Sequence, residues 1–275
     1  MKITRNMEYL LNKNDFLCLC ESQPSNPEII DLFIPGFGVN LFGSTQTDEI
    51  AEVVKIAYKD ILPNEHASVF FELQNYSSEN YNTSYALTFE EQSQRLKKVL
   101  IAITDKFPNS KINITAQSIG CLALIPLIEF LQSNNFLLHN LALWGPPTLE
   151  TDNHAERLSG AFINREGTII NLKGKSILQC KDQKKLIVEK EFWESLSRNT
   201  LVTNLKNISS LFSSVFLFFA SEDKLYPDDI LYYKNSMTDN CILIPIKGDS
   251  HTFRKPEMII KLRDLMIRYY LKQQS

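Results

Sequence analysis

The sequence predicts an α/β fold, in which a mostly parallel, twisted sheet is flanked by helices and carries a small inserted cap. Short apolar runs rich in β-branched and aromatic residues alternate with longer segments of helical period, a pattern typical of strand–helix units and parallel sheets. With 275 residues, 44% of them hydrophobic, the chain can bury the core of one large α/β domain. The alternation breaks once, between Pro146 and about Ser213, and this break indicates the cap.

The apolar runs are the predicted strands, and the segments between them are the predicted helices. In chain order the strands are Phe16 to Cys20, Ile29 to Ile34, Ser68 to Leu73, Lys111 to Ala116, Leu141 to Trp144, Val215 to Ala220 and Cys241 to Ile246. The helices are Asp48 to Lys59, Thr88 to Phe107, Ile119 to Gln132, a stretch starting near Asp228, and Lys255 to Leu271. In the last helix, apolar residues recur at three- and four-residue steps, so one face would cover the sheet.

These elements place the core in residues 1–145 and 214–275 and the cap in residues 146–213. Within the cap we expect a hairpin around Arg165-Glu166-Gly167 and a helical piece near Glu189 to Leu196. The polar stretch from Leu73 to Thr88 is predicted to be a long surface loop.

Charge and cysteine content exclude several functional classes. The 29 basic and 32 acidic residues give a formal charge of -3, so no nucleic-acid footprint and no bulk attraction to anionic lipid is expected. The cysteines are scattered, mostly within apolar runs, which predicts a reducing compartment without a disulfide framework or a metal site. No secretory signal or lipidation motif is visible, and the longest apolar stretch is about half a membrane span. We expect a cytoplasmic protein, monomeric or homodimeric, that binds neither nucleic acid nor membrane.

Ser118 is the first candidate functional residue. It lies between the buried strand ending near Ala116 and an apolar helix, with small residues, Ala116 and Gly120, two positions before and after it. This spacing is typical of a nucleophile elbow, because a serine in a strained turn leaves no room for larger flanking side chains. The helix start would also aim the Ile119 N–H at the negative oxygen of a substrate. The alternative is an ordinary helix start capped by Ser118.

Two other strand ends carry an acid and a base. Asp223 follows the strand that ends at Ala220, and His251 follows the strand that ends at Ile246. Because the carboxyl ends of parallel strands share one edge of a sheet, both side chains would lie on the same rim as Ser118. The alternatives are a solvated acid, with Glu222, Asp228 and Asp229 as competitors, and a structural or surface histidine.

The chain order Ser, Asp, His, each at the end of a separate strand, favours a catalytic triad over these alternatives. His251 would remove the proton from Ser118, and Asp223 would orient the imidazole and stabilise its charged form. The turn after the strand at Ile29 to Ile34 would supply the Phe37 N–H as the second oxyanion donor beside that of Ile119. For substrate contacts we predict Gly36, Gln117 and Trp144; neither a metal nor any other cofactor is expected.

With these residues the sequence resembles the α/β-hydrolase superfamily over almost the whole chain, from about Phe16 to Leu271. It is most similar to small-capped carboxylesterases of the feruloyl-esterase and serine-aminopeptidase-like group. The segment Phe218-Phe-Ala-Ser-Glu-Asp223-Lys-Leu-Tyr-Pro227 is similar to the strand, small residue, Asp and Pro pattern of the family, and Gly167 to Leu196 resembles its short cap.

The chain departs from the family pattern at three places. The usual His-Gly of the oxyanion loop is Pro35-Gly36, the first small residue of the elbow is Ala116, and Pro126 interrupts the helix after the nucleophile. We expect this proline to kink that helix about two turns in. None of the departures removes a triad member.

The resemblance and the predicted triad together imply a serine hydrolase that cleaves a carboxylic ester or thioester through an acyl-serine intermediate. Its partner would be a small-molecule acyl substrate, free or carrier-bound. Two alternatives stay open. The acyl-enzyme could pass its acyl group to another acceptor, as in an acyltransferase or cyclase, or the fold could bind a ligand without turnover.

Overall fold

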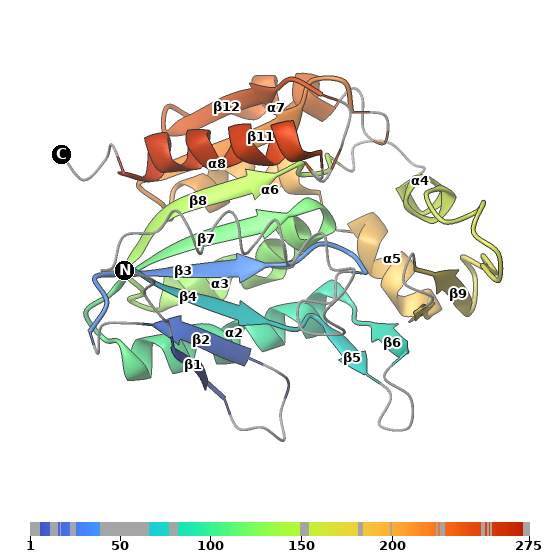
Figure 1. Cartoon of the computed structure of the whole chain (residues 1–275), viewed down its shortest axis with the longest axis horizontal. Coiled ribbons are helices and arrows are strands. Elements are labelled where there is room, and N and C mark those ends of the chain that lie inside the picture. The colour runs from blue at the N-terminus through green and yellow to red at the C-terminus, as the bar shows by residue number, and fades with distance from the viewer. Residues whose placement is uncertain are drawn as a thin grey trace.

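The computed structural model describes residues 6–11, 16, 18–22, 26–38, 66–76, 82–148, 154–180, 184–198, 200–223, 225, 229–248, 251, 253 and 255–271. The helix predicted at Asp48 to Lys59 lies outside the described residues. Within them, a large sheet runs through the centre, with helices on both of its faces (Figure 1).

In the described part of the chain, the large sheet has eight strands in the order β1-β2-β4-β3-β7-β8-β11-β12. All neighbours from β4 to β12 are parallel, whereas β1 and β2 pair antiparallel at one edge, so the mostly parallel sheet is confirmed. The strands are β1 (Asn6–Tyr9), β2 (Cys18–Ser22), β3 (Ile29–Ile34), β4 (His66–Phe71), β7 (Lys111–Gln117), β8 (Leu138–Trp144), β11 (Ser214–Ala220) and β12 (Cys241–Ile246).

The helices of the described residues are α2 (Phe89–Lys106), η1 (Ser118–Leu127), α3 (Ile128–Ser133), α4 (His154–Gly160), α5 (Lys190–Arg198), α6 (Leu201–Ser209), α7 (Asp229–Ser236) and α8 (Pro256–Leu271). Among them, α2, α5, α7 and α8 lie close to predicted positions, whereas α4 and α6 were not predicted. α2 begins where the sequence predicts because Thr88 and Glu91 form a capping box that satisfies backbone N–H groups at the helix start. None of these helices combines the length and apolar character that crossing a membrane requires.

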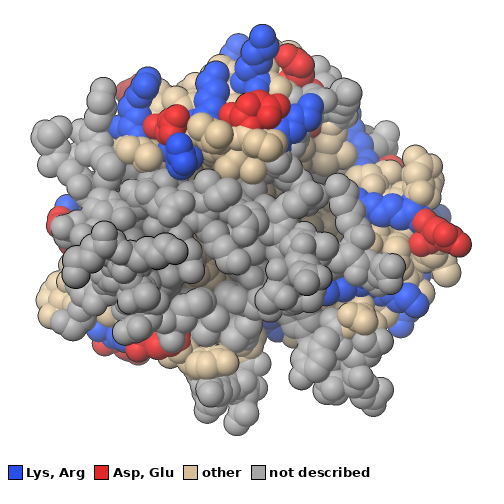
Figure 2. Space-filling view, viewed as in Figure 1, with Lys and Arg blue, Asp and Glu red and all other residues tan. Residues whose placement is uncertain are grey.

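Two apolar clusters fill the space between the sheet and its helices. β3 is buried at every position, as expected for a strand covered on both faces. Its Leu32 and Ile34 belong to a cluster that includes the buried faces of α2, η1 and α6. Phe33, between them, points the other way and packs with Trp144 and with Met258 of α8. On the face in Figure 2, basic and acidic side chains lie side by side over α8 rather than gathering by sign.

The segment after Ser118 differs from the prediction. Instead of one kinked α-helix from Ile119, residues Ser118–Leu127 form a 3-10 helix, and regular α-helix begins only at Ile128. Pro126 has no N–H for an i→i−4 hydrogen bond, which accounts for a break in α-helical bonding near it. The buried residues of η1 pack against α2 and α6.

A second, smaller sheet crosses the predicted boundary between core and cap. Its order is β5-β6-β10-β9, with β5 (Gln74–Tyr76), β6 (Thr83–Ala86), β9 (Ser176–Gln179) and β10 (Lys185–Val188). β5 and β6 lie in the stretch predicted as a surface loop, so that prediction is wrong for these residues. β6 is polar and is typical of a loop by composition, but it gains a parallel partner in β10. The boundary placed at residue 146 therefore does not separate the two sheets.

The predicted cap hairpin is displaced along the chain. The turn at Arg165 to Gly167 exists, with Gly167 in the left-handed region at φ 83° and the Thr168 N–H donating to the Arg165 carbonyl at 3.1 Å. It leads only to a single bridge between Ile169 and Ile177, whereas the antiparallel pair is β9 with β10. The predicted helical piece is confirmed as α5. In Figure 1 the arrowheads of β3, β7 and β8 point toward α4 and α5, so the cap lies beyond the carboxyl ends of these strands.

Candidate active site

The structure brings Ser118, His251 and Asp223 into one chain of hydrogen bonds. The Ser118 Oγ lies 2.8 Å from the His251 Nε2, and the His251 Nδ1 lies 2.6 Å from the Asp223 Oδ2. When the His251 Nδ1 carries the proton and donates to the Asp223 carboxylate, Nε2 can accept a hydrogen bond from the serine hydroxyl. The three residues come from the end of β7 and from the loops after β12 and β11, which meet at one rim because the strands are parallel.

Ser118 has the strained backbone that a nucleophile elbow requires. Its φ is 50°, in the left-handed region that non-glycine residues seldom occupy. A Cβ on Gly120 would lie 2.1 Å from the Pro35 carbonyl oxygen, so only glycine fits there. At the other flank Ala116 is fully buried, and its methyl group is accommodated in the core. The small residue after Ser118 therefore has a steric reason.

Asp223 is held by two contacts, one to each carboxylate oxygen. Oδ2 faces the imidazole, while Oδ1 accepts a hydrogen bond from the Leu225 N–H at 2.8 Å. The residue is 7% exposed, so its interaction with the imidazole is little weakened by water. Of the competing acids, Glu222 is exposed and Asp228 lies outside the described residues.

Gly145, directly after β8, is a residue that sequence reasoning missed. It adopts φ 56°, and a Cβ at this position would lie 3.0 Å from Cε1 and 3.2 Å from Nδ1 of His251. The imidazole therefore packs directly on the Gly145 backbone. The Gly145 N–H donates to the Phe218 carbonyl at 2.8 Å, and the Tyr233 hydroxyl donates to the Pro147 carbonyl at 3.0 Å, which fixes this turn. The sequence signal that could have found Gly145 is a glycine directly after a buried strand, at the same edge of the sheet as Ser118.

The predicted oxyanion loop lies against the elbow. A Cβ on Gly36 would come within 3.2 Å of the Gln117 carbonyl oxygen and 3.5 Å of the Ser118 Cβ, so the loop approaches the nucleophile as closely as backbone allows. Phe37, the predicted oxyanion donor in this loop, follows directly. Ile119, the other predicted donor, follows Ser118 at the start of η1.

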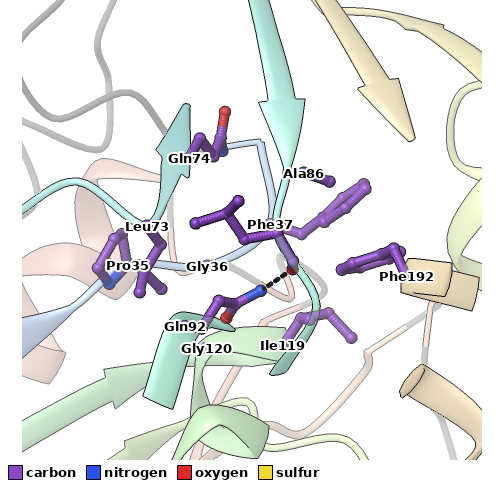
Figure 3. A pocket seen from close by; sticks show the side chains of 11 residues that line it. Pro35, Gly36, Phe37, Leu73, Gln74, Ala86, Gln92, Ile119, Gly120 and Phe192 are labelled. Atoms are coloured by element: carbon purple, nitrogen blue, oxygen red, sulfur yellow. Dashed lines mark hydrogen bonds between the residues drawn. The ribbon is translucent and has the colours of Figure 1, made fainter. Parts of the chain in front are cut away.

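A small hollow opens beside these two predicted donors (Figure 3). Its walls on the loop and elbow side are Pro35, Gly36, Phe37, Ile119 and Gly120, and on the far side Leu73, Gln74, Ala86, Leu87, Gln92 and Phe192. Gln92 is fixed by a hydrogen bond from its Nε2 to the Leu87 carbonyl at 2.7 Å. The enclosed volume is about 10 Å³, room for about one water molecule. Apart from two glutamines, the lining is apolar or glycine backbone.

Of the predicted substrate contacts, Gly36 lines the hollow, whereas Gln117 and Trp144 do not. Trp144 is fully buried in the core on the α8 face, with its ring centroid 5.6 Å from that of Phe33. The correction follows from strand geometry, since Trp144 pairs in register with Gln117 and both side chains project to the sheet face opposite η1. Gln117 is also fully buried, and its amide atoms have no hydrogen-bond partner among the described residues.

Cys121, three residues after Ser118, is not a competing nucleophile. Burial raises the pKa of its thiol well above the ordinary value, so the reactive thiolate is not formed at neutral pH. The thiol contacts the Ala116 carbonyl oxygen at 3.3 Å inside the elbow. No group of three or more His, Cys, Asp and Glu side chains in the described ranges is arranged to hold a metal ion.

Comparison with known proteins identifies the fold. No family model and no curated protein sequence matches the chain. Among solved structures, Est1E from Butyrivibrio proteoclasticus is 12% identical with a TM-score of 0.59 over 98% of both chains. The esterase domain from a Rhodothermus marinus protein is 10% identical with a TM-score of 0.61 over 97% of both chains. The monoacylglycerol lipase of Paleococcus ferrophilus is 11% identical with a TM-score of 0.59, over 93% of this chain and 98% of that one. The chain has the α/β-hydrolase fold.

Proposed function

We propose that the protein is a serine hydrolase that cleaves a carboxylic ester or thioester through an acyl-serine intermediate. The observation that carries the proposal is the continuous hydrogen-bond chain from Ser118 through His251 to Asp223, at 2.8 and 2.6 Å. Such an arrangement can convert a weakly nucleophilic hydroxyl into an attacking alkoxide, because the imidazole takes the proton as the bond to carbon forms. The structural neighbours named as esterases and as a lipase favour esters over amides.

In the first half of the proposed reaction, the Ser118 Oγ attacks the substrate carbonyl carbon while the His251 Nε2 takes the hydroxyl proton. Asp223 stabilises the imidazolium that forms. The N–H groups of Phe37 and Ile119 donate to the oxyanion of the tetrahedral intermediate. When this intermediate collapses, His251 gives its proton to the leaving alcohol or thiol, and the acyl group stays on Ser118.

In the second half, a water molecule attacks the acyl-serine carbonyl carbon, and His251 removes its proton. The second tetrahedral intermediate uses the same two N–H donors. Its collapse releases the carboxylic acid and returns the proton to the Ser118 oxygen, which restores the starting site.

The test combines turnover with active-site labelling. Purified protein is incubated with p-nitrophenyl acetate, butyrate and octanoate, and separately with a fluorophosphonate probe followed by mass analysis. We expect hydrolysis and one adduct on Ser118, with both lost in Ser118→Ala and both retained in Ser213→Ala, which removes a hydroxyl from an exposed serine. Labelling that persists in Ser118→Ala, or no turnover of any ester, contradicts the proposal. Adding alcohol and amine acceptors and analysing the products distinguishes hydrolysis from acyl transfer.

A further inference from the structure

Phe37 places its ring in an aromatic cluster, defined here as Phe37, Phe89, Phe162, Phe192 and Trp193. The Phe37 ring is stacked on that of Phe192, with centroids 5.0 Å apart and planes at 28°. Phe162 meets it edge-on at 6.0 Å, and Trp193 meets it tilted at 6.5 Å. The loop residue predicted to carry an oxyanion donor is therefore packed between rings contributed by the cap.

Phe192 is the centre of this cluster. Besides Phe37, it contacts Phe89 at 5.7 Å, at the start of α2, and Trp193 at 5.4 Å. Its side chain is 1% exposed. Within the cluster, Phe37 and Phe192 are the members that also line the hollow beside the elbow, and Figure 3 shows their rings next to each other there.

Phe37 lies between two glycines. Gly36 precedes it, and Gly38, at φ 70°, follows it. Glycines have access to a wide range of backbone angles, so a residue flanked by two of them is free to rotate unless its side chain is held. Gly38 is itself close to the cap, since a Cβ there would lie 3.6 Å from the Leu186 Cδ2. The ring contacts of Phe37 therefore hold the loop on the cap side, while the Gly36 backbone packs against the elbow on the other side.

We infer that Phe192 is a positioning residue for the proposed reaction: its ring holds the Phe37 ring, and through it the Phe37 N–H, at the oxyanion position. The inference rests on the proposed function. A hydrogen-bond donor must lie within about 3 Å of the developing oxyanion to stabilise it, so a loop that rotates by a few tens of degrees loses most of its effect. Cap helix α5 therefore completes the reaction centre without contributing a reacting atom.

The kinetic test compares Phe192→Ala with two control variants. Phe192→Tyr keeps the aromatic ring. Leu196→Ala removes an equally buried side chain from the same helix but leaves the aromatic cluster complete. We expect Phe192→Ala to lower kcat for p-nitrophenyl acetate by about 10- to 100-fold with KM changed less than about threefold, since losing an oxyanion donor outright lowers kcat about 10²- to 10³-fold. Affinity for a trifluoromethyl ketone, whose hemiketal oxygen needs the same donors, should fall by a similar factor. Phe192→Tyr should stay within about threefold of the wild type, and Leu196→Ala should retain kcat.

A second readout does not depend on activity. In hydrogen–deuterium exchange, Phe192→Ala should speed amide exchange in peptides covering 35–38 while leaving peptides covering 111–117 at the wild-type rate; Leu196→Ala should change neither. Unchanged exchange at 35–38, or an equal loss of kcat in Leu196→Ala, overturns the inference even if the wild type hydrolyses esters. A wild type that hydrolyses no ester overturns the proposed function instead, and the exchange result still decides whether Phe192 holds the loop.

Discussion

The imidazole of His251 rests directly on the backbone of Gly145, with only 3.0 Å between its Cε1 and the position that a Gly145 side chain would occupy. Gly145 adopts φ 56°, a conformation that also disfavours any residue with a Cβ. The imidazole is therefore positioned from three directions: by Asp223 at Nδ1, by Ser118 at Nε2, and by a glycine against its ring.

Gly145→Ala should displace the imidazole and lower kcat/KM by about 10- to 100-fold, because an error of about 1 Å in a reacting group can cost about 10²-fold in rate. The measurement is ester hydrolysis by the purified variant, with its fold checked by circular dichroism. Gly160→Ala is the matched control, since nothing lies within 4 Å of a Cβ at that glycine and its rate should be unchanged. A Gly145→Ala enzyme as fast as the wild type would show that the contact is not needed.

Asp223→Asn should keep the shape of the site but reverse the hydrogen bonding at Nδ1 when the amide group donates. In serine proteases the same change lowers kcat by about 10⁴-fold, because the imidazole is held in the wrong tautomer. We expect a loss of about 10³- to 10⁴-fold in kcat here, measured with p-nitrophenyl esters. Glu222→Gln changes the adjacent, exposed acid and should leave kcat within about twofold. Similar losses of kcat in both variants would mean that Asp223 acts through its negative charge and not through its hydrogen bond to His251.

Stability should fall in alkaline solution because of buried thiols. Burial, with a smaller effect from Cys20, raises the pKa of Cys18 to about 12, and burial also raises the pKa of Cys121. Above about pH 9 the unfolded chain loses thiol protons that the folded protein keeps, so the free energy of unfolding falls as pH rises. For Cys18 the window runs from 9.0 to about 12.

The expected slope is at most about 1.4 kcal/mol per pH unit for each such thiol. Urea unfolding at intervals between pH 8 and pH 11 measures it. Cys18→Ala should flatten the slope, although the variant is less stable at pH 8 because it loses a buried side chain. A slope unaffected by Cys18→Ala would assign the alkaline loss to other groups.

The strands that the sequence predicts well are those formed by an unbroken apolar run. β3 was predicted at its observed bounds and β11 one residue short, because a short, unbroken apolar run rich in β-branched and aromatic residues is typical of a strand covered on both sides. β1, β5 and β6 have no such run and were missed. β6 gains a partner in β10, which is distant in the chain, and no local pattern reports that.

The candidate site likewise contains residues that the sequence predicts and residues that it does not. The proximity of Ser118, Asp223 and His251 could be predicted because each follows a buried strand, and parallel strands bring such ends together. Gly145 acts through contact of its backbone with the His251 ring, and Phe192 acts through contact of its ring with Phe37. Neither contact produces a recognisable residue spacing in the sequence. The predicted substrate contact of Trp144 was wrong because a position at the end of a strand does not tell on which face of the sheet the side chain lies.

The pairing of β6 with β10 joins Thr83 to Lys185, positions about one hundred residues apart in the chain. Closing so long a loop is entropically unfavourable until other contacts have brought its ends together, and contacts of this range form slowly. Before that, β5 and β6 are a bare two-stranded hairpin, which is marginal in water. We expect the large sheet to assemble first during folding and the small one last.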